Sequence, residues 1–308
     1  TASYNVAVGK DALDANTTAS YNTAVGYDAL GATTTGDGRN TAMGYQAAVA
    51  LTTGNRNVAV GSVAGQALTS GEHNSFLGNN AGGSTTTASY NSAFGSGALD
   101  TNTTGANNTA IGARSLQANT TAGSNTAVGY DAMYANTTGA SNVAVGRDAL
   151  ASNTTGSENT AVGKSAADAV TTGTRTVAVG FNAGGGLTTG DSNVAIGYQA
   201  LMTEDAHSNN VAIGASALQT QNAGAHAYNT AVGFEAGKAI TTGIYNTAVG
   251  ANTLLANTTG ASNNAFGYGA LTANTTAAYN NAFGINALAA NTTGASNSAF
   301  GHTALAAN

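Results

Sequence analysis

A five-residue motif, Asn-x-Ala-apolar-Gly, recurs along the whole chain of 308 residues. It starts eighteen times, and fifteen of the seventeen intervals between successive starts are 17 residues long; the other two are 18 and 19. A fixed period of this length is typical of stacked repeats, in which each unit buries its apolar face against its neighbours. We therefore expect residues 1–308 to form a single repeat array. Its predicted coils begin at residues 5, 22, 40, 57, 74, 91, 108, 125, 142, 159, 176, 193, 210, 229, 246, 263, 280 and 297, after a partial coil at 1–4.

Numbering each coil from its Asn shows which positions the repeat requires. Position 5 is Gly in all eighteen coils, position 1 is Asn in all but Thr176, and position 3 is Ala in all but Phe76. Position 4 is always Val, Ile, Leu, Met or Phe. The predicted structural ladder at position 1 consists of Asn5, Asn22, Asn40, Asn57, Asn74, Asn91, Asn108, Asn125, Asn142, Asn159, Asn193, Asn210, Asn229, Asn246, Asn263, Asn280 and Asn297. The predicted corner glycines at position 5 are Gly9, Gly26, Gly44, Gly61, Gly78, Gly95, Gly112, Gly129, Gly146, Gly163, Gly180, Gly197, Gly214, Gly233, Gly250, Gly267, Gly284 and Gly301.

The length of the unit decides its secondary structure. Seventeen residues with a fixed Gly are too few for a pair of helices, and Asn, Thr and Gly are poor helix formers. We predict an all-β fold, a parallel β-solenoid or β-roll of about eighteen 17-residue coils, about 85 Å long at one strand spacing per coil. Gly at position 5 would allow a positive φ, and stacked Asn amides would bond to one another. The absence of Pro fits coils that all donate backbone hydrogen bonds.

Positions 9 and 12 exchange large apolar residues. Twelve coils have Leu or Met at position 9, as at Leu150, and a polar residue at position 12. Five others have Ala or Gly at position 9 and an aliphatic residue at position 12, as in the pair Gly237 and Ile240. The remaining coil has Gly82 and Thr85 at these positions and Phe76 at position 3. We interpret this as one core slot that is filled from different backbone positions, because voids and overfilling both destabilise a core.

Positions 3 and 4 are both apolar although they lie on opposite sides of a strand. We therefore expect two large side chains and three Ala to be buried in each coil. One side of the strand would face the lumen, and the other would need a neighbour. A homotrimer would supply that neighbour. The alternative is that Ala at position 3 faces solvent and is merely tolerated.

Composition excludes several classes of function. Charged residues make up 7% of the chain, with eight Lys and Arg and a net charge of −6. This leaves no basic surface for nucleic acid. No apolar run is long enough to insert in a membrane, and no signal-peptide pattern opens the chain. Cys is absent, so disulfides cannot stabilise the fold.

Catalytic and cofactor-binding residues are not predicted. There is no Cys nucleophile, the four His residues are scattered, and no phosphate-binding loop is present. The best constellation is Glu204, Asp205, His207 and His226, where the repeat becomes irregular. We interpret it as a polar bulge over the 19-residue repeat rather than as a metal site.

Thr or Ser occupies both positions 13 and 14 in fifteen of the seventeen complete repeats. The interpretation we favour is that β-branched Thr suits a strand and bonds along its ladder. An ice-binding hydroxyl array is the alternative, although adjacent strand residues point to opposite faces. Asn-Thr-Thr is also a formal N-glycosylation acceptor. These possible glycosylation sites are Asn16, Asn102, Asn119, Asn136, Asn153, Asn257, Asn274 and Asn291.

Tyr recurs at position 6 and at the last position of the coil, as in Tyr27 and Tyr21. Exposed aromatic columns could stack on glycans of a host surface. Packing between neighbouring coils or subunits is the alternative.

The repeat resembles a known family of sequences. NTAVGYDAL at 22–30 and NTTGASN at 136–142 are similar to repeats of phage and prophage tail-fibre proteins and to the head of YadA-like trimeric autotransporter adhesins. This resemblance implies a left-handed parallel β-roll that trimerises. The coil is longer here, with extra residues in the Thr-Thr-Gly arm.

Three functions are compared on these observations. The favoured one is a structural or adhesive segment of an extracellular fibre, on a virion or a cell surface, that provides reach, stiffness and a repetitive binding surface. The alternative is a solenoid that binds ice or crystal surfaces through its Thr columns. An enzyme on a solenoid scaffold would need a cleft rich in charged groups, and this sequence offers none.

Overall fold

The structure is a computed structural model that describes residues 1–224 and 226–307. Ala225 and Asn308, which belong to the predicted array, lie outside the described residues. The described residues contain eighteen strands of three residues each and no helix. The chain is an all-β parallel β-solenoid, as its period predicts. It divides into two compact units, Thr1–Thr155 and Gly156–Asn308.

The first unit contains β1 (Val6–Val8), β2 (Thr23–Val25), β3 (Thr41–Met43), β4 (Val58–Val60), β5 (Ser75–Leu77), β6 (Ser92–Phe94), β7 (Thr109–Ile111), β8 (Thr126–Val128) and β9 (Val143–Val145). The second contains β10 (Thr160–Val162), β11 (Val177–Val179), β12 (Val194–Ile196), β13 (Val211–Ile213), β14 (Thr230–Val232), β15 (Thr247–Val249), β16 (Asn264–Phe266), β17 (Asn281–Phe283) and β18 (Ser298–Phe300).

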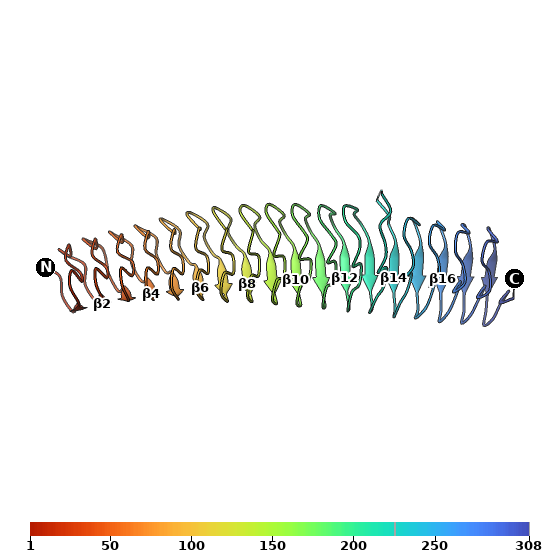
Figure 1. Ribbon diagram of the computed structural model, residues 1–308, viewed down its shortest axis with the longest axis horizontal. Helices are drawn as coiled ribbons and strands as arrows, with labels where there is room; N and C mark the ends of the chain where they lie inside the picture. The colour runs from red at the N-terminus through yellow and green to blue at the C-terminus, as the bar shows by residue number, and fades with distance from the viewer. Residues whose placement is uncertain (225, 308) are drawn as a thin grey trace. The chain divides into compact units, whose positions relative to one another are not determined.

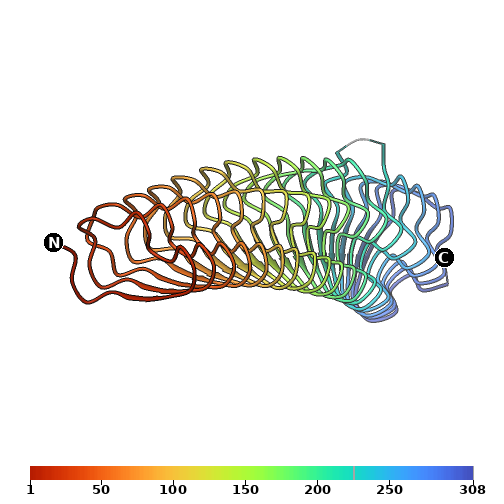
Figure 2. The same ribbon diagram turned by 60° about the vertical axis from the view of Figure 1, so that its left-hand side comes forward.

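Within each unit, successive strands pair in parallel and in register. Ala127 of β8 pairs with Ala144 of β9, and Ala178 of β11 pairs with Ala195 of β12. Figure 1 shows the strands of each unit side by side, and Figure 2 shows that successive coils follow the same path. Equivalent residues of successive coils therefore lie on one another, as the repeat predicts.

Backbone hydrogen bonds between coils continue beyond the short strands. Met133 N donates to Ala149 O at 2.9 Å, and Thr120 N donates to Thr137 O at 3.1 Å. The last residue of a coil bonds in the opposite direction, as Ser124 N does to Ala106 O at 3.0 Å. Proline cannot donate, so it would break this ladder at any of these positions.

Each complete coil turns through at least four residues with positive φ. Gly at position 5 is the most extreme: Gly129 has a φ of 141°, and a Cβ on it would lie 2.4 Å from Gly146 O. The corner role predicted for this Gly is therefore explained both by its backbone conformation and by the close approach of the next coil. Positions 7, 9 and 17 are also left-handed, as at Asp131 (56°), Met133 (51°) and Ser124 (61°). Sequence reasoning missed these three positions.

The lumen of each coil is filled by positions 1, 3, 8, 9, 12 and 15. In the coil from 125, the fully buried side chains include Asn125, Ala127, Ala132, Met133 and Asn136. Ala at position 3 therefore faces the core, and the solvent-facing alternative is wrong. Position 4 points outward, to the side of the strand for which a neighbouring subunit was predicted, so only one of the two large side chains lies in the lumen. One large side chain fills the lumen together with small residues and Asn amides.

The core slot is shared as the exchange between positions 9 and 12 predicts. A Cβ on Gly237 would lie 2.9 Å from Ile240 Cδ1, so Ile240 occupies the space that Leu fills in other coils. A Cβ on Gly82 would lie 2.6 Å from the ring of Phe76, which fills the same slot from position 3. Phe76 and Ile240 are both fully buried.

The two irregular repeats place their extra residues in the same arm. In the 18-residue repeat, Thr34 N donates to Thr52 O and Arg39 N to Ser20 O, so the coil is in register on both sides of the extra residue. In the 19-residue repeat, Asn222 N donates to Thr241 O, which keeps position 13 in register. Extra length is thus accommodated between position 13 and the end of the coil.

Candidate functional site

The Asn residues at position 1 link one coil to the next. Asn142 N donates to Asn125 Oδ1 at 2.9 Å, and Asn125 Nδ2 donates to Gly139 O at 2.9 Å within its own coil. The same pattern recurs in the second unit, where Asn246 N donates to Asn229 Oδ1 at 2.8 Å. The predicted amide-to-amide bonds form in only some coils. The recurring bond runs from the backbone of one Asn to the side chain of the Asn before it.

Thr176 interrupts this ladder. Its backbone N donates to Asn159 Oδ1 at 2.9 Å, but its own Oγ1 is buried without a hydrogen-bond partner. A hydroxyl on Cβ is too short to reach both groups that an Asn amide joins. At this coil of the second unit, the side chain at position 1 therefore makes no bond in the ladder.

The Asn residues of the glycosylation motif form a second, internal column. Asn119 is fully buried, and its Nδ2 donates to Asn102 Oδ1 at 2.9 Å and to Ala122 O at 3.0 Å. Asn274 makes the same two kinds of bond in the second unit. The amide nitrogen that a glycan would modify is thus turned into the lumen in the folded coil.

The two Thr columns differ in what they expose. Position 13 is partly buried, and its hydroxyl donates to the next coil, as Thr120 Oγ1 does to Thr137 O at 3.1 Å. Position 14 is exposed, as at Thr121 and Thr138. Only one Thr column therefore presents free hydroxyl surface, and an ice-binding plane would depend on that single column.

Aromatic residues of adjacent coils stack in pairs in each unit. Tyr4 and Tyr21 lie with centroids 5.0 Å apart and planes 9° apart, and Tyr27 and Tyr45 are 5.5 Å apart. Cations cover further faces: the Arg39 guanidinium lies 5.6 Å from the Tyr21 centroid. Stacking thus covers one face of each paired ring, and the edges and hydroxyls stay accessible to a ligand.

One aromatic cluster was not predicted from the sequence. Arg114 lies over the rings of Tyr130 and Tyr134, at 4.9 Å and 5.2 Å from their centroids, and pairs with Asp131. Its members come from positions 6, 7 and 10 of adjacent coils, and no sequence motif links them. It extends the cation and ring stacking of the column.

Position 4 forms an outward-facing apolar stripe in each unit. Its side chains are half-buried or exposed, with Ile111 at 40% and Val145 at 37% in the first unit. In the second unit Phe266, Phe283 and Phe300 stack with centroids 4.7 Å and 5.0 Å apart. Regular solvent exposure of such residues is a feature of surfaces that bind another apolar surface.

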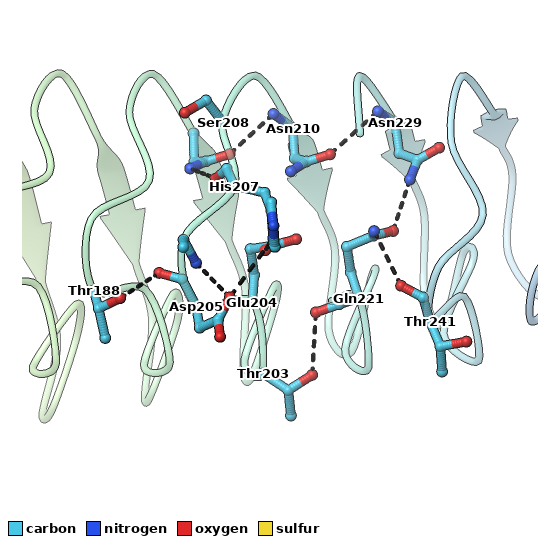
Figure 3. Close-up of polar contacts among 12 residues, drawn as sticks. Thr188, Thr203, Glu204, Asp205, His207, Ser208, Asn210, Gln221, Asn229 and Thr241 are labelled. Carbon is cyan, nitrogen blue, oxygen red and sulfur yellow. Dashed lines mark hydrogen bonds and ion pairs between the residues drawn. The ribbon is translucent and has the colours of Figure 1, made fainter. Parts of the chain in front are cut away.

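Three of the four residues in the irregular constellation lie together. Glu204 Oε1 is 2.5 Å from His207 Nδ1, and Asp205 Oδ1 is 3.6 Å from the same nitrogen (Figure 3). His226 is not part of this group and packs edge-on against Tyr228. Glu204 occupies position 12 and is fully buried in the lumen. The interpretation of a polar bulge over the 19-residue repeat is therefore wrong for Glu204, which lies in the lumen of the preceding 17-residue coil.

The environment of Glu204 disfavours its charged form. Burial raises the pKa of its carboxyl, and the hydrogen bond with His207 partly offsets this effect. The second carboxylate oxygen, Oε2, is buried without a hydrogen-bond partner. This coil therefore holds an acidic group where most other coils hold an amide or an apolar side chain.

Comparisons with known proteins give no family. No protein-family model matches the chain, and no curated protein is significantly similar to it. The described residues contain no pocket and no helix with the length and apolarity to cross a membrane.

Proposed function

We propose that this chain is a structural and adhesive segment of an extracellular fibre, a left-handed β-solenoid that assembles as a homotrimer. The observation that carries the proposal is the apolar stripe at position 4, which repeats at the same place in every coil of each unit. A monomer would leave these side chains in water. Three copies packed along their stripes would bury them, since association is driven by removing apolar surface from water.

The resemblance to tail-fibre and adhesin repeats supports the same assembly. In such a fibre the coils provide stiffness, and the remaining outer surface is displayed many times. We propose that the exposed side chains of the Tyr columns contact a surface glycan or host receptor, because aromatic rings stack on sugars and their hydroxyls form hydrogen bonds. Many weak contacts on one particle would combine into strong attachment.

The mass of the purified chain in solution tests the proposed assembly. The wild-type chain should sediment as a trimer in analytical ultracentrifugation. Replacing Ile111 and Val145 by Lys places charges on the stripe and should give monomers. Lys at Thr121 and Thr155, exposed residues at position 14 of the same two coils, is the matched control and should leave the trimer intact. A wild-type chain that stays monomeric over its whole soluble range would refute the assembly.

A further inference from the structure

The coil from 193 to 209 differs from the others in the chemistry of its lumen. In coils with Asn at position 12, the amide donates to the carbonyl at position 15 of the same coil, as Asn136 Nδ2 does to Gly139 O at 3.0 Å. Here position 12 is Glu204, which has no such donor when ionised. Position 15 is His207 instead of a small residue, and its carbonyl accepts from Asn193 Nδ2 at 2.8 Å. Two lumen positions have therefore changed together.

These changes place a carboxylate where ionisation needs a compensating positive charge. The Glu204 side chain has 0% exposure, and its Oε2 has no hydrogen-bond donor. A buried ionised carboxylate is costly unless it is paired or coordinates a metal ion. His207 faces one oxygen only, and the nearest Lys or Arg ion pair described in the second unit, Lys238 with Glu235, is made elsewhere.

We propose that Glu204, Asp205 and His207 form a binding site for a divalent transition-metal ion, with Zn²⁺ as the best match. One imidazole nitrogen and two carboxylate oxygens offer ligand atoms that all lie within 4.8 Å of one another. Ligands of a tetrahedral Zn²⁺ with bonds of about 2.1 Å are about 3.4 Å apart, so small side-chain rotations suffice. The mixed nitrogen and oxygen donors favour Zn²⁺ or Co²⁺ over Mg²⁺ and Ca²⁺, which prefer oxygen alone.

The three residues also form a path from solvent. Asp205 is 52% exposed, His207 is 13% exposed and Glu204 is fully buried. An incoming ion would meet Asp205 first and then displace the proton that His207 Nδ1 and Glu204 Oε1 share. The released proton goes to solvent, and His207 binds the ion as neutral imidazole through Nδ1. Three protein ligands leave the fourth position for water.

The site lies where the regular ladder is weakened. Thr188 Oγ1 donates to Asp205 O at 2.8 Å, but Asp205 has no hydroxyl to pass the Thr ladder on to the next coil (Figure 3). A metal ion would cross-link positions 12, 13 and 15 of this coil next to the 19-residue repeat. The inference does not depend on the proposed fibre function.

Calorimetric titration of the full chain with Zn²⁺ tests the site. We expect one Zn²⁺ per chain and a higher thermal midpoint in its presence. Co²⁺ should give the visible absorption bands of a four-coordinate site. Glu204→Gln and His207→Gln should each weaken binding at least tenfold, since each removes a ligand. His226→Gln is the matched control, because His226 lies outside the cluster, and should bind as the wild type does.

Two results would overturn the proposal. One is a wild-type chain without saturable binding of one ion at millimolar Zn²⁺. The other is a His207→Gln variant that binds as tightly as the wild type. If Glu204→Gln does not fold, the exposed Asp205→Asn variant replaces it, and unchanged affinity in that variant would remove Asp205 from the site.

Discussion

At the scale of single residues, the backbone is controlled by the stacking rather than by local preference. Gly at position 5 could be predicted from the sequence because only Gly combines a large positive φ with close backbone contact. Asp131 and Met133 are left-handed too; Asp adopts this conformation more readily than most residues, whereas Met gives no such indication. Their conformation follows from hydrogen bonds to the neighbouring coil, such as Met133 N to Ala149 O, which no single repeat contains.

The Asn ladder, too, could be predicted only in part. Recurring Asn at position 1 predicts a ladder, but it does not predict the main hydrogen bond, because the donor is the backbone N–H of the next coil. The exception, Thr176, is a defect whose repair should be measurable.

Thr176→Asn should stabilise the chain. The new amide would accept from Asn193 N and donate to Gly190 O, repeating the contacts that Asn125 makes. Two hydrogen bonds to buried backbone groups contribute about 1–2 kcal/mol in total. Thermal unfolding should show a higher midpoint. Asn125→Thr, the reverse change in a regular coil, should lower it, and equal midpoints for all three proteins would contradict the account of the ladder.

At the scale of the coil, the lumen needs one large side chain, but that side chain can come from different positions of the repeat. Because large residues exchange between positions 9 and 12, the sequence predicted that the side chains at both positions point into the lumen. The outward direction of position 4 follows from the same exchange: Phe76 fills the slot from position 3, so the next residue of the strand points to the other side. Glu204 was misplaced because a charged residue in an irregular stretch suggests a bulge, whereas the position-12 register takes it into the lumen.

The shared slot predicts a compensating pair of substitutions. Gly237→Leu alone should overfill the space next to Ile240 and cost about 1–3 kcal/mol. Ile240→Asn alone should leave a cavity and cost about 3 kcal/mol. Together they recreate the commoner coil, in which Leu is at position 9 and Asn joins the column that continues at Asn257. Most of the stability should return, which denaturant unfolding of all four proteins would show.

The outcome that would contradict this prediction is that the two losses of stability add. If the double variant loses the sum of the two single losses, positions 9 and 12 do not share a slot. A control pair in separate coils of the second unit, Gly237→Leu with Leu288→Ala, should be close to additive because two whole coils lie between the two sites.

At the scale of the whole molecule, the chain folds with few charged residues. Charged residues make up 7% of the sequence, and in the ion pairs between described Lys or Arg and acidic residues the cation is 37–74% exposed. Surface pairs contribute little to folding. The lumen is instead closed by Ala, one large apolar residue and Asn amides, and these interactions do not depend on ionic strength.

Stability should therefore be nearly independent of salt. Between about 0.05 M and about 1 M NaCl, where screening changes strongly, the unfolding free energy should shift by less than about 1 kcal/mol. Thermal unfolding followed by circular dichroism in metal-free buffer measures this. A shift of several kcal/mol would indicate that charged pairs carry more of the fold than their exposure suggests.

The register of the irregular repeats has a consequence for how such a chain can change in length. Residues were added only in the arm after position 13, whereas the segment from Asn to position 13 has one fixed size in every complete coil. Loss or duplication of a whole 17-residue unit would leave equivalent positions stacked on one another. We therefore expect arrays of this kind to change in length by whole coils, and to accept shorter insertions only in this arm.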